Sequence, residues 1–173
     1  VNVFAFDSEI ACGPQGMFAI EAAKMAAQGM SGAEIIAELE QLKKTMDAYF
    51  IVDDLSHLQR GGRLSATSAF IGGLLQVKPI LHFREKVIVP YEKIRTRKKA
   101  MRRVEEQLAA AVAIDPNLQA VIIHANCESQ GRDWLEQLAG EYPTVDFKLS
   151  YFGPVIGSHL GEGAIAMGWM AKK

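Results

Sequence analysis

Hydrophobic and polar positions follow two different periods along the chain. Short runs rich in β-branched and aromatic residues predict strands, whereas apolar residues spaced three and four apart predict amphipathic helices. The predicted strands cover residues 1–6, 48–53, 77–83, 86–93, 120–125, 145–151 and 164–170, and the predicted helices begin at residues 13, 31, 65, 96 and 129. Because helices and strands alternate, we expect an α/β or mixed α+β fold in which helices flank mixed sheets.

Three local signals place boundaries within this pattern. Ser31 followed by Glu34 forms a capping box, which predicts the start of a helix. Pro90 has no backbone N–H to donate, so we expect its strand to lie at an edge of a sheet. Helical periodicity ends near Asp47, and we place a boundary between two parts of the chain there.

Composition and charge narrow the class of protein. The 173 residues are 49% hydrophobic and carry a net charge of −1, which indicates a globular protein without a general attraction to nucleic acid. Cys12 and Cys127 are not spaced as metal ligands or as a disulfide framework, so we expect no metal site and a cytoplasmic location. No apolar run reaches the roughly 18 to 20 residues of a membrane span, so we expect no integral membrane segment.

The segment Gly61-Gly62-Arg63 is the first candidate site. Paired glycines permit positive φ and close approach of a ligand, and Arg63 offers a guanidinium fork to a carboxylate or phosphate. The alternative is a helix that ends at Gly61 and leaves the arginine in solvent. The predicted helix that follows carries an apolar stripe that includes Phe70, Ile71, Leu74 and Leu75. A core face and the wall of a tunnel for an acyl chain share this lining, so both interpretations stay open.

A basic stretch from residue 93 to residue 103 holds seven Lys or Arg residues and no acid. Most of these cations lie in the first turns of the helix that begins at Thr96, where they oppose the helix dipole. An acidic protein partner or a phosphate-bearing ligand would relieve this unfavourable placement, and a solvated basic face is the alternative. Nucleic acid is less favoured, because the stretch has no interleaved aromatic residues.

His159 lies in a glycine-rich segment, residues 153–163, which we expect to be a loop between two strands. An imidazole there would hydrogen-bond a carboxylate, act as a general base in a hydrolase, or serve the structure of the loop. Neither Ser8 nor Ser158 has the flanking glycines of a nucleophile elbow, so the hydrolase hypothesis lacks a nucleophile. The other histidines show no metal-ligand spacing with His159.

Several motifs occur in order along the chain: Asp7-Ser8, residues 53–63, Lys78-Pro79-Ile80-Leu81, residues 95–100 and the glycine-rich segment 153–163. In this order the chain resembles the DegV family, bacterial proteins that bind fatty acids. The resemblance implies a two-domain α/β fold with the lipid between the domains. It also implies a non-enzymatic carrier without a cofactor, which presents a long-chain fatty acid to a separate fatty acid kinase.

The resemblance also assigns roles to particular parts of this chain. Residues 1–47 resemble the end of the first domain, whose N-terminal part is missing here, and residues 48–173 resemble the complete second domain. The implied ligand-binding residues are His159, Ser158, Phe70, Ile71, Leu74, Leu75, Ser8, Gly16 and Met17. The implied basic rim, at the head group or the kinase, is Arg63, Arg95 and Arg97. Two positions depart from the family pattern: Cys12 replaces a serine, and Glu162 replaces a proline.

Overall fold

The structure is a computed structural model that describes residues 1–63, 77–84 and 86–173. Its elements in chain order are α1 (Cys12–Ala27), α2 (Gly32–Lys43), β1 (Asp47–Ile51), α3 (Ser56–Arg60), β2 (Lys78–Arg84), β3 (Val87–Ile94), α5 (Arg97–Ile114), β4 (Leu118–His124), α6 (Glu128–Glu141), β5 (Asp146–Tyr151), α7 (Pro154–Leu160) and β6 (Ile165–Ala171). The mixed α/β class predicted from the sequence is confirmed.

The strands form one mixed sheet with the order β3-β2-β1-β6-β4-β5. β4 and β5 pair in parallel, and the other neighbouring strands pair antiparallel. β3 lies at one edge of the sheet, so the predicted edge position of Pro90 is confirmed. At an edge, a residue without a backbone N–H need not interrupt the pairing of a further strand. The pairing of β2 with β3 shifts its register between Ile80 and Leu81, opposite Pro90.

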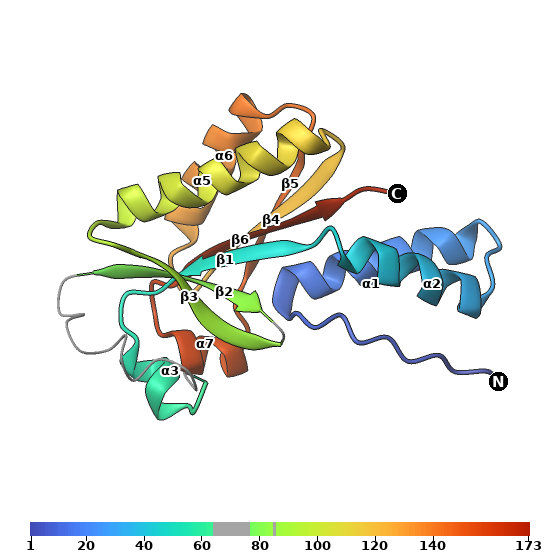
Figure 1. Cartoon of the computed structure of the whole chain (residues 1–173), viewed down its shortest axis with the longest axis horizontal. Coiled ribbons are helices and arrows are strands. Elements are labelled where there is room, and N and C mark those ends of the chain that lie inside the picture. Colours follow the sequence, from blue (N-terminus) through green and yellow to red (C-terminus); the bar gives the residue numbers. More distant parts are fainter. Residues whose placement is uncertain (64–76, 85) are drawn as a thin grey trace.

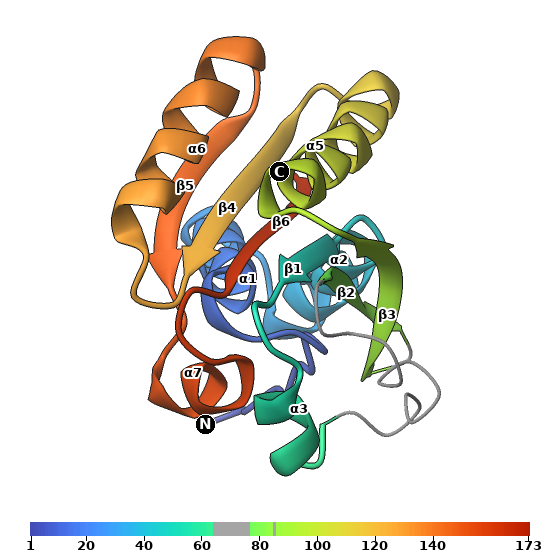
Figure 2. The same ribbon diagram turned by 90° about the vertical axis from the view of Figure 1, so that its left-hand side faces the viewer.

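Successive residues of the central strands point to opposite faces of the sheet, as the pleat requires. On β1, Tyr49 and Ile51 belong to the core under α5 and α6, whereas Phe50 and Val52 belong to the core on the other face. Figure 1 shows α5 and α6 together on one side of the sheet. The helices on the opposite side form two groups, α1 with α2 and α3 with α7 (Figures 1 and 2).

The core under α5 is built on one helical stripe. Ala100, Val104 and Leu108 follow one another at intervals of four residues, and each is at most 1% exposed. The indole of Trp134 on α6 donates a 2.7 Å hydrogen bond to Glu105 Oε1 on α5 and so joins the two helices. The periodicity that predicted these helices therefore corresponds to their buried faces.

On the other face, α1 and α2 pack against the sheet and against each other. The predicted capping box at the start of α2 is confirmed. The Ser31 side chain accepts a hydrogen bond from the backbone N–H of Glu34, and the backbone N–H of Ser31 donates a 2.8 Å hydrogen bond to Glu34 Oε2. Glu21 of α1 is fully buried, and it accepts hydrogen bonds from Lys24 and, at 2.9 Å, from Gln119 of β4. The predicted boundary between two domains at residue 47 stays a prediction. In the described chain, α1 and α2 pack on the sheet that residues 47–171 form.

Two sequence predictions about secondary structure are wrong. Residues 1–6 form no strand, because no described strand lies beside them to complete a ladder, and Val1 and Val3 are exposed. Residues 154–160 form the helix α7 and not a loop, since Pro154 occupies its first turn and Gly161, at φ 80°, ends it. The predicted helix from residue 65 to residue 75 lies outside the described residues.

Candidate ligand-binding cavity

A cavity of about 450 Å³ lies on the face of the sheet that carries α1, α3 and α7. Its floor comes from three adjacent strands, through Phe50 of β1, Ala166 of β6 and Ile123 of β4. Its walls come from the segment before α1, from α3, from α7 and from the β2–β3 hairpin. The volume falls within the range of about 300 to 1,000 Å³ that is typical of small-molecule sites.

Most of the cavity lining is apolar, and the charged members of the lining are exposed. The described apolar lining residues are Ile10, Ala11, Pro14, Ala48, Phe50, Leu58, Phe83, Val87, Ile88, Ile123, Phe152, Ile156, Leu160 and Ala166. The charged residues among the described lining are Asp7, Glu9, Arg63 and Lys86. An apolar interior with charges at its mouth suits a ligand with a hydrocarbon tail and a polar end.

The helix α7 presents one face to the cavity. Gly153 and Pro154 start the helix, which places Ile156 and Leu160 four residues apart on the same side as His159. Leu160 is 4% exposed and Ile156 packs against the same core. The imidazole of His159 therefore lies beside the apolar wall, within the lining of the cavity.

α3 and α7 interlock through two histidines and two glycines. A Cβ added to Gly61, at the end of α3, would lie 2.1 Å from Nδ1 of His159. Reciprocally, a Cβ added to Gly161, at the end of α7, would lie 2.8 Å from Cδ2 of His57 on α3. Each ring thus fills the space that a side chain would take, and the absence of a side chain at Gly61 leaves room for the ring of His159.

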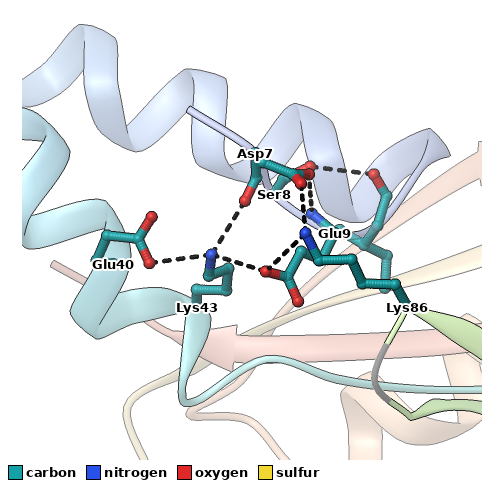
Figure 3. Close-up of polar contacts among 7 residues, drawn as sticks. Asp7, Ser8, Glu9, Glu40, Lys43 and Lys86 are labelled. Carbon is teal, nitrogen blue, oxygen red and sulfur yellow. Dashed lines mark hydrogen bonds and ion pairs between the residues drawn. The ribbon is translucent and has the colours of Figure 1, made fainter. Parts of the chain in front are cut away.

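A network of ion pairs spans part of the cavity mouth (Figure 3). Lys86, at the turn of the β2–β3 hairpin, lies 2.8 Å from Asp7 Oδ2 and 3.6 Å from Glu9 Oε1. Lys43 of α2 donates to the backbone oxygen of Asp7 at 3.1 Å and lies 3.2 Å from Glu9 Oε1 and 2.9 Å from Glu40 Oε2. The hydrogen bond from Lys86 is the main cause that lowers the pKa of Asp7, and the same contact raises the pKa of Lys86.

Cys12 lies inside this mouth, half-buried in the cavity lining. Burial raises the pKa of its thiol, and a hydrogen bond with the backbone of Gly153 opposes this shift only in part. The side chain is therefore a neutral thiol near pH 7, which is a poor nucleophile. A thiol is a weaker hydrogen-bond donor than the serine hydroxyl that the resemblance implies at this position.

The structure brings two of the predicted site residues together at the cavity. Arg63 and His159 both line it. Arg63 follows α3 and is exposed, and its Nη1 donates a 3.3 Å hydrogen bond to the backbone oxygen of Gly61. Glu162, the second departure from the family pattern, accepts a 2.8 Å hydrogen bond from Asn126 Nδ2.

Other predicted ligand-binding residues lie elsewhere in the described chain. Ser8 donates to the backbone oxygen of Ile10 at 3.0 Å and lines a second cavity, of about 370 Å³, between α1 and α2. Ser158 is exposed and donates to the backbone oxygen of Val155 at 2.7 Å. Gly16 is exposed on α1, and Met17 is 3% exposed in the core. Phe70, Ile71, Leu74 and Leu75 lie outside the described residues.

The two predicted arginines of the basic stretch differ in their surroundings. Arg97 is directed inward: Nε donates to Gln130 at 2.8 Å, Nη1 lies 3.1 Å from Asp53 Oδ1, and Nη2 donates to the backbone oxygen of Gly163. Arg95 is exposed. Arg97 thus ties the start of α5 to the loops that follow β1 and precede β6, whereas Arg95 faces solvent.

Sequence reasoning missed most of the cavity lining. Lys86 and Glu9 were not singled out, because the ion pairs that use them join positions far apart in the chain. Ile156 and Leu160 carried a usable signal: an i, i+4 apolar pair after Gly-Pro is the pattern of a short amphipathic helix.

Two classes of feature are not found in the described part of the chain. No group of three or more His, Cys, Asp or Glu side chains there is arranged to hold a metal ion. None of the helices in residues 1–63, 77–84 and 86–173 is both long and apolar enough to cross a lipid bilayer.

Known proteins with similar sequences share nearly the whole of this chain. The chain is 56% identical over 173 residues to protein DegV of Bacillus subtilis, an alignment that covers 99% of this chain and 62% of that protein. A DegV domain-containing protein of Listeria innocua is 52% identical over 172 residues, with 99% of this chain and 61% of that protein covered. The chain therefore spans about three fifths of the length of these relatives.

Solved structures and a family model agree with these similarities. The crystal structure of DegV from Bacillus subtilis, described as a fatty acid binding protein, superposes with a TM-score of 0.91 at 55% identity, covering 99% of this chain and 61% of that one. A fatty acid binding DegV family protein from Streptococcus agalactiae gives 0.88 at 38% identity, covering 98% and 60%. The model of the DegV family matches residues 1–172. The chain belongs to the DegV family.

Proposed function

We propose that this protein binds a long-chain fatty acid in the cavity beneath α7. The observation that carries the proposal is an apolar cavity of about 450 Å³ with Arg63 and His159 in its lining. The hydrocarbon tail would lie on the floor formed by Phe50, Ile123 and Ala166, where burial of apolar area stabilises it by about 25 cal/mol per Å². The carboxylate would lie at the mouth.

Arg63 and His159 suit a carboxylate. A guanidinium presents paired N–H donors that match the two oxygens of a carboxylate, and an imidazole supplies one more donor. Phe70, Ile71, Leu74 and Leu75, which lie outside the described residues, remain predictions as ligand contacts, as do Ser8, Ser158, Gly16 and Met17. Relatives support the proposal, since the DegV structures from Bacillus subtilis, Streptococcus agalactiae and Thermus thermophilus are described as fatty acid binding.

We propose a carrier in preference to an enzyme. A hydrolase that uses His159 as a base needs an activated nucleophile within hydrogen-bond reach. Cys12 is the thiol among the described lining residues, and its raised pKa disfavours the thiolate. The hydroxyl of Ser158 is occupied by the backbone oxygen of Val155.

Calorimetric titration with palmitate and oleate, and native mass spectrometry of the resulting complexes, test this function. We expect a 1:1 complex, and we expect Arg63→Gln to weaken binding about tenfold, as loss of a charge-assisted hydrogen bond requires. The matched control Arg102→Gln removes an exposed arginine of α5, across the sheet from the cavity, and should bind as the wild type does. A protein that forms no complex with either acid would refute the proposal.

We further propose that the exposed cations within and just before α5 bind an acidic surface on a protein partner, the fatty acid kinase that the resemblance to the family implies. Arg95, Lys98, Lys99 and Arg102 are exposed, and the first turn of α5 contains no acid. Such a surface would present the loaded lipid while the partner supplies the chemistry. If the chain binds no lipid, the alternative function is that of a protein-interaction module that binds the kinase through the same surface.

Charge reversal tests the partner surface. Arg95→Glu and Lys98→Glu should each weaken binding to the purified kinase, and the affinity should fall steeply with salt. Arg97 is unsuitable for this test, because its contacts with Asp53 and Gln130 hold the fold together. Lys44→Glu, at the exposed residue that follows α2, is the control. Equal binding by all of these variants would count against the surface.

A further inference from the structure

The segment from Asp7 to Cys12 forms one wall of the cavity mouth without belonging to a helix or strand, apart from Cys12 itself. Two of its residues, Glu9 at φ 58° and Cys12 at φ 59°, adopt the left-handed backbone region that non-glycine residues rarely occupy. Local preference therefore does not favour this conformation, and contacts with the rest of the molecule must hold it.

Two lysines supply those contacts from opposite directions. Lys43 of α2 binds the backbone oxygen of Asp7 and the carboxylate of Glu9, so it fastens the segment to the helix behind it. Lys86 binds the carboxylate of Asp7 and lies 3.6 Å from that of Glu9, so it fastens the same segment to the hairpin. Figure 3 shows the Glu9 carboxylate between the ammonium groups of Lys43 and Lys86.

The positions of these contacts matter for access to the cavity. The hairpin side of the lining consists of Phe83, Lys86, Val87 and Ile88, and the segment side runs from Asp7 to Cys12. The Lys86 ion pairs join these two sides. Without Lys86, the segment would keep its attachment to α2 through Lys43 and lose the ion pairs that Lys86 makes to it from the hairpin.

We propose that Lys86 is a positioning residue that closes the cavity mouth by holding the Asp7–Cys12 segment against the β2–β3 hairpin, and that it thereby sets the rate of ligand exchange. The inference rests on the proposed fatty acid binding. The pairs are suited to reversible opening, because Lys86 and Asp7 have side chains that are 60% and 67% exposed. Exposed pairs are weak and are screened by salt.

Release kinetics test the closing role. The protein is loaded with the fluorescent fatty acid cis-parinaric acid, and release is followed by stopped flow after addition of excess oleate. Lys86→Gln should speed release about two- to tenfold, the range expected from the loss of exposed ion pairs. Lys98→Gln, with the same change of charge on exposed α5, should leave it unchanged. Added salt should speed release from the wild type and have little effect on Lys86→Gln.

Alkylation of Cys12 gives a second readout that needs no ligand. The protein is exposed briefly to iodoacetamide, and labelling of each cysteine is measured by peptide mass spectrometry. Lys86→Gln should raise the labelling of Cys12. The labelling of Cys127, which lies outside the cavity lining, should stay unchanged and serves as the internal reference. If Lys86→Gln does not fold, Asp7→Asn removes the same ion pair and keeps an oxygen for the 3.0 Å hydrogen bond from the N–H of Glu9.

The two readouts separate the failure of each proposal. Faster labelling of Cys12 without any binding of cis-parinaric acid would support the closing role of Lys86 and refute fatty acid binding. Binding with unchanged release and unchanged labelling would overturn the role of Lys86 and leave fatty acid binding in place.

Discussion

The substitution Gly61→Ala should weaken fatty acid binding through His159, a residue 98 positions away. Gly61 has φ −77°, so alanine fits its backbone, and the perturbation is the added methyl group alone. That methyl would lie 2.1 Å from Nδ1 and 2.8 Å from Cε1 of His159, whereas non-bonded atoms rest at about 3.5–4.0 Å. The imidazole must therefore move by more than about 1 Å, which exceeds the tolerance of a hydrogen bond of about 2.7–3.2 Å.

A hydrogen bond to a charged group contributes about 1.5–3 kcal/mol. Its loss corresponds to a Kd about tenfold to a hundredfold higher, measured by calorimetry with palmitate. His159→Ala should give the same loss, and the double variant Gly61→Ala/His159→Ala should give no more than either single change. Additive losses would refute this reasoning, as would wild-type affinity in Gly61→Ala beside weak binding in His159→Ala.

Three further predictions concern stability. Gly16→Ala, where no heavy atom lies within 4 Å of the added Cβ, should raise the free energy of unfolding by about 1 kcal/mol in a denaturant titration and leave binding unchanged; reduced affinity would instead place Gly16 at the ligand. Leu108→Ala, at a fully buried position under α5, should cost about 2–5 kcal/mol in the same measurement, and a cost below 1 kcal/mol would contradict the packing described. The pKa of Asp7 in the folded state is lowered from 3.8, so the contribution of Asp7 to stability is complete above about pH 4. This contribution is lost as the pH falls through the lower pKa of the folded state. Asp7→Asn should remove this part of the loss of stability when unfolding is measured against pH.

Much of the fold could be predicted from periodicity alone, because periodicity reports which faces are buried. Val104 and Leu108 predicted the buried face of α5, and the run around Ile122 predicted β4. The failures have specific causes. Val1 to Phe6 has the composition of a strand, but a strand exists only where a neighbour completes its hydrogen bonds. In the segment 153–163 the number of glycines outweighed the signal of Pro154 at a helix start.

The candidate site was less accessible to sequence reasoning, because its residues meet only after folding. The bond from Lys86 to Asp7 joins positions 79 apart, and no local pattern indicates that these two residues pair. Ser8 and Ser158 were predicted to bind the ligand, yet each hydroxyl donates to a backbone oxygen two or three residues away. Such local bonds are common for serine and compete with a role at a ligand.

The two glycines of the Gly-Gly-Arg motif have different structural reasons. Gly62 adopts φ 66°, the positive φ that paired glycines permit, whereas Gly61 leaves room for a neighbouring side chain. Paired glycines before an arginine indicate close approach of a ligand, but at Gly61 the group that approaches is the ring of His159. Gly161 does the same for His57, so the motif at residues 61–63 and the one at residues 153–163 form one packed unit. Arg63 lies two residues after Gly61 and lines the same cavity as His159, so we expect a change in either motif to disturb both residues.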